Sequence, residues 1–180
     1  MVDWWIQFIK ALWLLLPAYA ANGSPPLSRG IHPLDFKRNF IDGKRILGDG
    51  KTFEGTFLGL TAGFLVGALE TFSYPFLNNY LINFNISLPP MNLFIGFMIS
   101  FGALIGDMVA SFIKRRFNLP RGADVPLMDQ WNFVIGAIVF TFWLTEINIF
   151  MIIIMFLITP IVHRIANIIA YKIKIKREPW

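Results

Sequence analysis

Long apolar stretches constrain the fold of this chain more than any other feature of its sequence. Four are visible, and they cover residues 2–21, 55–76, 93–113 and 131 to about 171. An α-helix needs about 20 residues to cross a bilayer, so the first three stretches each have the length of one span. The last is too long for one crossing and is interrupted by the polar tetrapeptide 145–148, which suits a helical hairpin. The sequence therefore predicts an all-α integral membrane protein with about five transmembrane helices.

Composition supports this class and excludes others. Of the 180 residues, 56% are hydrophobic and only 15% are charged, which is too apolar for a soluble domain of this size. The chain has no cysteine, so disulfides and thiolate metal sites are excluded, and two histidines leave little scope for a zinc centre. The net charge of +5 comes from short basic clusters beside apolar runs, so we expect no nucleic acid partner. We expect one domain over residues 1–180.

The basic residues are distributed unevenly among the connecting segments. Residues 22–54 hold six Lys and Arg, residues 114–130 hold four, and the C-terminal tail from Lys172 holds four, whereas residues 77–92 hold none. Basic segments remain on the cytosolic side of a membrane. We therefore expect an N-terminus outside, a cytosolic C-terminus and a long cytosolic loop between the first two helices. The predicted location is the cell membrane, with several crossings.

A polar stripe runs along the third apolar stretch. Its members are Ser100, Asp107, Ser111 and Lys114. Their positions differ by seven, four and three, so they share one helical face. Asp107 lies seven residues before Lys114, or roughly 10 Å below the cytosolic edge at 1.5 Å per residue. A carboxylate at such depth costs about 2 to 3 kcal/mol and usually has a function. An ion pair that only stabilises helix packing is the alternative.

A second carboxylate, Asp129, stands where the fourth apolar stretch begins. Alone it would be read as a helix cap, because Asp often has that role. Together with Asp107 at the same depth, it predicts a site for one or two Mg²⁺ ions, which bind a few carboxylates and substrate phosphates. Asp124 is a further candidate from the same loop.

The loop before the second stretch contains a glycine-rich run, Gly48-Asp49-Gly50-Lys51-Thr52. Flexible glycines, a lysine and free amides at a helix start suit a polyphosphate. The spacing is not that of a Walker A motif. A simple turn in which Thr52 caps the helix is an equal alternative.

Two further candidates lie near the cytosolic end of the last stretch. His163 and Arg164 could contact a lipid phosphate, and a packing pair or an Arg that extends to the interface is the alternative. Glu70, near the outer end of the second stretch, is expected at the membrane interface.

Three ordered strings, GDGKTFEG, GDMVASFIKRR and LPRGADVPLMDQ, closely resemble the CDP-archaeol synthase family over nearly the whole chain. More distantly, they resemble the phosphatidate cytidylyltransferases, although Gln130 stands where those enzymes carry Arg. The resemblance implies that CTP and 2,3-di-O-geranylgeranylglycerol 1-phosphate react, with Mg²⁺, to give CDP-archaeol and pyrophosphate on the cytosolic side.

In that reaction the candidate residues have three roles. The catalytic residues would be Asp107, Asp129 and Lys114, with both aspartates as metal ligands. The nucleotide-binding residues would be Arg45, Gly48, Gly50, Lys51, Thr52, Ser111 and Arg115. The lipid-phosphate candidates would be His163 and Arg164.

A different function class remains open at this point. A small transporter or channel could use Asp107 as its ion site. The ionisable residues gather at the cytosolic side, however, and do not form a path toward Glu70. A CDP-alcohol phosphotransferase is disfavoured, because its motif of aspartates on one helix is absent.

Overall fold

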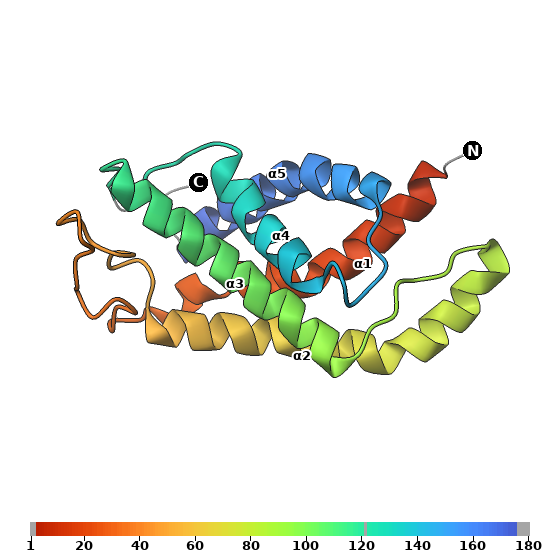
Figure 1. Cartoon of the computed structure of the whole chain (residues 1–180). Helices are drawn as coiled ribbons and strands as arrows, with labels where there is room; N and C mark the ends of the chain where they lie inside the picture. The colour runs from red at the N-terminus through yellow and green to blue at the C-terminus, as the bar shows by residue number, and fades with distance from the viewer. Residues whose placement is uncertain (1–2, 121, 176–180) are drawn as a thin grey trace.

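The computed structural model describes residues 3–120 and 122–175, which form a bundle of helices (Figure 1). The long helices are α1 (Trp4–Gly23), α2 (Phe53–Leu81), α3 (Leu93–Arg116), α4 (Met128–Thr141) and α5 (Ile149–Lys172). Two short 3₁₀ helices, η1 (Pro25–Ser28) and η2 (Ile82–Phe84), follow α1 and α2. The described residues contain no strand, only isolated bridges between Pro33 and Thr52 and between Asn39 and Arg45. The polar tetrapeptide 145–148 falls between α4 and α5.

Three helical segments have the length and composition of membrane spans, so this is a multi-pass membrane protein. They are Phe53–Phe84, Leu93–Arg116 and Ile149–Lys172. Helix α4 has 14 residues, or about 21 Å at 1.5 Å per residue, which is shorter than a hydrocarbon core of about 30 Å. Helix α1 has 20 residues, but it carries Gln7 and Lys10 and does not meet the same criteria. Five spans therefore remain a prediction.

Local sequence explains where three of the helices begin. At each start a polar side chain accepts a hydrogen bond from a backbone N–H in the first turn, which would otherwise lack a partner. The three pairs are Thr52 with Gly55 at 3.1 Å, Asn92 with Ile95 at 2.9 Å and Asn148 with Met151 at 3.0 Å. Thr52 therefore has the capping role that the sequence left as one of two alternatives.

Glycines allow the helices of the bundle to approach closely. A Cβ on Gly67 of α2 would lie 2.6 Å from the Cα of Gly96 on α3, and a Cβ on Gly136 of α4 would lie 2.1 Å from the carbonyl oxygen of Gly102 on α3. Small residues at such crossings are typical of membrane helices, because backbones in contact gain dispersion energy where no hydrophobic effect operates. The contact between α3 and α4 positions the candidate site.

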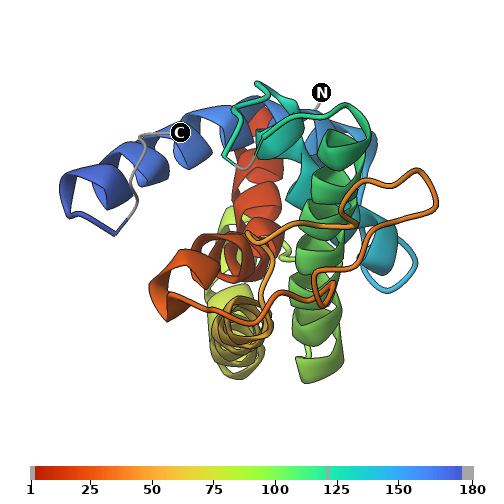
Figure 2. The same cartoon turned by 90° about the vertical axis from the view of Figure 1, so that its left-hand side faces the viewer.

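The connecting segments divide between the two ends of the bundle (Figure 1). The 24–52 loop, the 117–127 loop and the C-terminal end of α5 lie at one end, and the 85–92 and 142–148 segments lie toward the other. Figure 2 views the bundle from the first end and shows the 24–52 loop passing across α3 before it joins α2. This end contains the basic segments.

The surroundings of Glu70 were not evident from its position near the outer end of the span. Its side chain is buried within the helix bundle at 4% exposure. Neither carboxyl oxygen has a hydrogen-bond partner among the described residues. The interior of the helix bundle, rather than water, therefore surrounds this carboxyl group.

Replacement of Glu70 by Gln is expected to stabilise the fold. An ionised carboxylate without a partner is unfavourable in an apolar interior, and Gln keeps the shape without the charge. We expect about 1 kcal/mol of stabilisation, at the lower end of what the removal of buried charge provides. Thermal unfolding in detergent measures this effect. Glu146→Gln, at an exposed position, is the control that should not change the melting temperature. A less stable Glu70→Gln protein would contradict the prediction.

Candidate active site

Two lysine–carboxylate pairs define the site, at the end of the bundle where the 24–52 loop lies. Lys51 lies two residues before the start of α2, and its ammonium group donates to the carboxylate of Asp107 on α3. The ammonium group of Lys114 on α3 lies 2.5 Å from Oδ1 and 2.6 Å from Oδ2 of Asp129 on α4. All four side chains are partly buried. One ion pair thus connects the 24–52 loop to α3, and the other connects α3 to α4.

The two carboxylates belong to helices, α3 and α4, whose backbones are in contact close to both residues. A Cβ on Gly106 would lie 2.2 Å from the carbonyl oxygen of Asn132, so the two backbones touch at this level. Asp107 follows Gly106 directly, and Asp129 precedes Asn132 by three residues, or about 4.5 Å along the axis. Asp107 and Asp129 thus stand on two helices in contact, and their sharing of one metal ion stays a prediction.

Asp129 is not the helix cap that its position alone suggested. Leu127 occupies the cap position, and Asp129 instead accepts hydrogen bonds from Lys114 and from the backbone N–H of Val125 at 3.0 Å. Lys114 also donates to the carbonyl oxygen of Ala123 at 2.8 Å. The buried side chain of Gln130 accepts the N–H of Leu127. These contacts hold the 117–127 loop against the start of α4.

The glycine-rich run lies against the end of α3. Gly48 is buried and adopts φ +87°, a left-handed conformation that favours glycine. A Cβ at this position would lie 3.6 Å from Cδ of Arg115, so the run and the basic end of α3 are in van der Waals contact. Gly50 is exposed, and Ser111, which lies between Asp107 and Lys114 in the sequence of α3, is partly buried. The structure thus brings Gly48 and Arg115 together, and the nucleotide-binding role of these residues stays a prediction.

Asp35 organises the 24–52 loop, and sequence reasoning did not single it out. Its buried carboxylate accepts both Nε (3.1 Å) and Nη2 (2.7 Å) of Arg45. It also accepts three backbone N–H groups, from Lys37, Leu47 and Gly48, at 2.9 to 3.1 Å. Burial acts to raise the pKa of the Asp35 carboxyl, but these hydrogen bonds outweigh it and hold the pKa well below its usual range.

The contacts of Arg45 indicate a different role from the one expected. Its guanidinium is bidentate on Asp35 and also lies 2.9 Å from Asp49. It is therefore engaged within the loop and not directed at the two lysine–carboxylate pairs. Nothing in the sequence distinguishes Asp35 from the exposed Asp42 and Asp49, because burial depends on the folding of the whole loop.

Asp35→Asn is expected to lower the free energy of opening the 24–52 loop by about 1.5 kcal/mol, which is typical of a hydrogen bond to a charged group. Because the folded pKa is depressed, the stabilisation by Asp35 is fully present above about pH 4 and is lost as the pH falls toward the folded value. Limited proteolysis of the loop measures the opening. The wild-type loop should become more sensitive only in acid, whereas the Asn variant should be sensitive at neutral pH. Equal cleavage of the two proteins at pH 7 would contradict this.

Arg116 anchors the same loop to α3. Its guanidinium lies over the rings of Phe40 (5.2 Å) and Phe112 (4.6 Å) and pairs with Asp42 at 2.8 Å. It also donates to the carbonyl oxygens of Lys44 and Arg45. The basic triplet that ends α3 was visible in the sequence, but the separate contacts of its members were not. Arg115 lies against Gly48, and Arg116 binds the 24–52 loop.

The lipid-phosphate candidates on α5 contact the 117–127 loop and α4. Arg164 Nη1 is 3.8 Å from Oδ2 of Asp124, so Asp124 is associated with α5 rather than with the other two carboxylates. His163 Nδ1 is 3.2 Å from Nδ2 of Asn167, and its ring faces Phe133. Arg164 and Asp124 connect the 117–127 loop to α5.

The carboxylates fit a magnesium ion that is shared with a substrate. Among the described residues no group of three or more His, Asp and Glu side chains is arranged to hold a metal by itself. Mg²⁺ does not require such a group, because it commonly binds one or two carboxylates and completes its octahedron with substrate phosphates and water. Asp107 and Asp129 are the residues that could hold it.

The chain is similar to known proteins over nearly its whole length. The profile of the CarS-like family, described as CDP-archaeol synthase, matches residues 5–180. The CDP-archaeol synthase of Methanocaldococcus jannaschii is 44% identical, covering 94% of this chain and 96% of its own length, and that of Pyrococcus abyssi is 40% identical, covering 95% and 97%.

A solved structure described as an intramembrane enzyme for archaeal membrane lipids biosynthesis is also similar. It has a TM-score of 0.76 and 34% sequence identity, and the match covers 89% of this chain and 94% of that one. The resemblance drawn from the three motifs is thereby confirmed, and the chain belongs to the CDP-archaeol synthase family.

Proposed function

We propose that this chain is a cytidylyltransferase that joins CTP to the phosphate of an unsaturated archaeal ether lipid, 2,3-di-O-geranylgeranylglycerol 1-phosphate, to give CDP-archaeol and pyrophosphate. The observation that carries the proposal is the two partly buried lysine–carboxylate pairs, Lys51–Asp107 between the loop and α3 and Lys114–Asp129 between α3 and α4. The descriptions of the relatives supply the substrate class. Carboxylates and lysines together suit a polyphosphate with a divalent cation.

The reaction needs charge neutralisation more than proton transfer. A phosphate monoester has a second pKa of about 6, so the lipid phosphate is mostly a dianion at neutral pH and needs no general base. Its oxygen attacks the α-phosphorus of CTP, the bond from that phosphorus to the bridging oxygen breaks, and pyrophosphate leaves with the electron pair. Cationic groups that stabilise the developing charge therefore supply most of the catalysis.

The lysine–carboxylate pairs explain how the site accommodates its ligands. Without ligands each ammonium neutralises one carboxylate, so no unpaired charge is buried. When a nucleotide binds, Lys51 and Lys114 exchange the carboxylates for phosphate oxygens, and Asp107 and Asp129 become free to hold the cation. Mg²⁺ bound there would add positive charge beside the leaving pyrophosphate. In this proposal the nucleotide is also bound by Gly48, Gly50, Thr52, Ser111 and Arg115, while Arg45 stabilises the loop through Asp35 and Asp49.

We further propose one domain with five crossings, an external N-terminus and a cytosolic site in the cell membrane. The gathering of the basic segments at the end of the bundle that contains the site supports this orientation (Figure 1). The chain has no native cysteine, so a cysteine at Asn83 reports the position of the segment after α2. Membrane-impermeant maleimide should label it from outside in intact cells. Labelling only after the cytosolic face is opened would reverse the orientation.

The direct test of function is pyrophosphate release by the purified protein with each of the four NTPs, Mg²⁺ and the unsaturated ether-lipid phosphate. We expect release with CTP that requires both the lipid phosphate and the cation. Release without the lipid would indicate a simple nucleotide hydrolase. No release, together with ion flux through reconstituted vesicles that Asp107→Asn abolishes, would favour the transporter.

A further inference from the structure

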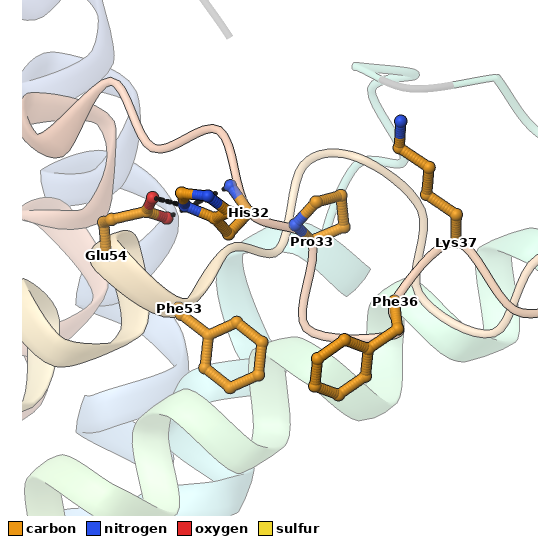
Figure 3. A pocket seen from close by; sticks show the side chains of 6 residues that line it. All are labelled: His32, Pro33, Phe36, Lys37, Phe53 and Glu54. Carbon is orange, nitrogen blue, oxygen red and sulfur yellow. Dashed lines mark hydrogen bonds and ion pairs between the residues drawn. The ribbon is translucent and has the colours of Figure 1, made fainter.

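An apolar cleft lies where α2 begins, two residues after Lys51 of the proposed active site. It is a cleft of ≈ 430 Å³ lined by His32, Pro33, Phe36, Lys37, Phe53 and Glu54. Its walls are mainly apolar, because the rings of Phe36 and Phe53 lie side by side, 5.3 Å apart, next to Pro33 (Figure 3). The polar residues His32 and Glu54 pair with each other at 2.5 Å. Lys37 makes no ion pair within the described part of the chain and leaves a net positive charge.

The cleft continues a surface of α2 that faces lipid. Phe53 is the first residue of α2, and Phe57 lies four residues later on the same helical face. Phe57 is 74% exposed, in a segment with the length and composition of a membrane span. An aromatic ring on the outside of such a span contacts lipid. The stripe of Phe57, Phe53 and Phe36 therefore leads from the bilayer to the loop.

The loop holds Phe36 in this position against a conformational cost. Phe36 and Lys37 adopt φ values of +48° and +61°, which side chains other than glycine rarely adopt and which cost about 1 kcal/mol or more each. The N–H of Lys37 is bound by Asp35, and that of Phe36 by the carbonyl oxygen of Pro33. The result is a ring that is 70% exposed and projects to one side of the loop, while Lys37 projects to the other (Figure 3).

The backbone connects the cleft to the reacting groups. Residues 32–34 bond with residues 51–53, through Leu34 N–H to Lys51 and Phe53 N–H to His32. Lys51, which reaches Asp107, is two residues from Phe53, so their Cα atoms are at most about 7 Å apart. A ligand whose apolar part lies against Phe53 can therefore extend its polar end toward Lys51, which pairs with Asp107.

We propose that this cleft binds the lipid phosphate substrate, with the first isoprenoid units against Phe36 and Phe53 and the phosphate directed to Lys51. The proposal rests on the proposed function and assigns its lipid site to the start of α2 instead of to His163 and Arg164 on α5. Its volume is within the range of small-molecule sites and admits the glycerol and the start of each chain. The remaining chain lies along Phe57 in the bilayer.

The kinetic test compares Phe36→Ala with Ile41→Ala, which removes a 94% exposed apolar side chain from the same loop outside the cleft. We expect Phe36→Ala to raise the KM for the lipid phosphate about tenfold, as the loss of part of a phenyl contact should. The KM for CTP and kcat should stay near wild type, and Ile41→Ala should change nothing. An unchanged lipid KM, or an equal rise in the KM for CTP, would overturn the proposal. Unchanged melting temperatures verify that both variants fold.

The binding test does not need turnover. The protein in nanodiscs is irradiated with a geranylgeranylglycerol phosphate that carries a diazirine in its first isoprene unit, and labelled peptides are identified by mass spectrometry. We expect labels in residues 31–37 and 53–57 that unlabelled lipid phosphate displaces. Displaceable labels on α5 around His163 would overturn the assignment. Labels that a lipid without a phosphate displaces equally well would mean a general bilayer contact and would also overturn it. Because the label needs no CTP, this result is independent of whether the protein is a cytidylyltransferase.

Discussion

Asp107→Asn and Asp129→Asn are each expected to lower CTP turnover by at least about 100-fold, the loss typical when a group that stabilises transition-state charge is removed. Asn keeps the shape of the side chain but cannot neutralise a cation. Each substitution also leaves a lysine, Lys51 or Lys114, without its carboxylate partner. Turnover against Mg²⁺ concentration measures the effect, and we expect the remaining activity of each variant to require more Mg²⁺.

The double variant should be little worse than either single one, because the loss of a second ligand from a disabled metal site has little further effect. Asp124→Asn is the matched control. Its carboxylate lies in the same region but is associated with Arg164, so turnover should remain near wild type. If folded Asp107→Asn protein turned over CTP normally at limiting Mg²⁺, the Lys51–Asp107 pair would be a packing contact only.

Gly136→Ala is expected to be the most destabilising single-methyl change, at roughly 3 kcal/mol, the upper end of the usual cost of overpacking. The added Cβ would lie 2.1 Å from the carbonyl oxygen of Gly102 and 2.9 Å from the Cα of Gly106. All of these atoms are backbone, so no side-chain rotation can relieve the clash, and α3 and α4 must move apart. The distance between Asp107 and Asp129 would increase with them, so activity should fall together with the melting temperature.

Gly23→Ala is the control, since a Cβ there meets no atom within 4 Å. Both variants place Ala in a helix, where it is favoured over Gly by about 1 kcal/mol, so Gly23→Ala should be neutral or slightly stabilising. A Gly136→Ala protein with the wild-type melting temperature and full turnover would show that the contact between α3 and α4 is looser than the structure indicates.

Local sequence patterns were sufficient to determine the class of this protein and the chemical types in its site. Apolar runs of span length require helices, because a bilayer leaves no other partner for backbone polar groups. The helices α2 and α3 begin within two residues of the predicted positions. The polar stripe through Asp107 and Lys114 was visible because helical periodicity depends only on spacing along the chain. The three motifs identified the family because they are also read directly from the order of residues along the chain.

Only the tertiary structure decided which of these groups meet. Lys51 and Asp107 are 56 residues apart in sequence, and their pairing depends on how the 24–52 loop crosses α3. The burial of Asp35 and of Glu70 has the same origin, since a carboxylate gives no local sign of whether the folded chain will cover it. Periodicity and composition report the face and the environment of one segment, whereas partners and burial arise from the packing of several segments against one another. For that reason the sequence alone determined the all-helical membrane class, the family and the candidate residues, and the tertiary structure decided the two lysine–carboxylate pairs, the contacts of Arg45 and the cleft at the start of α2.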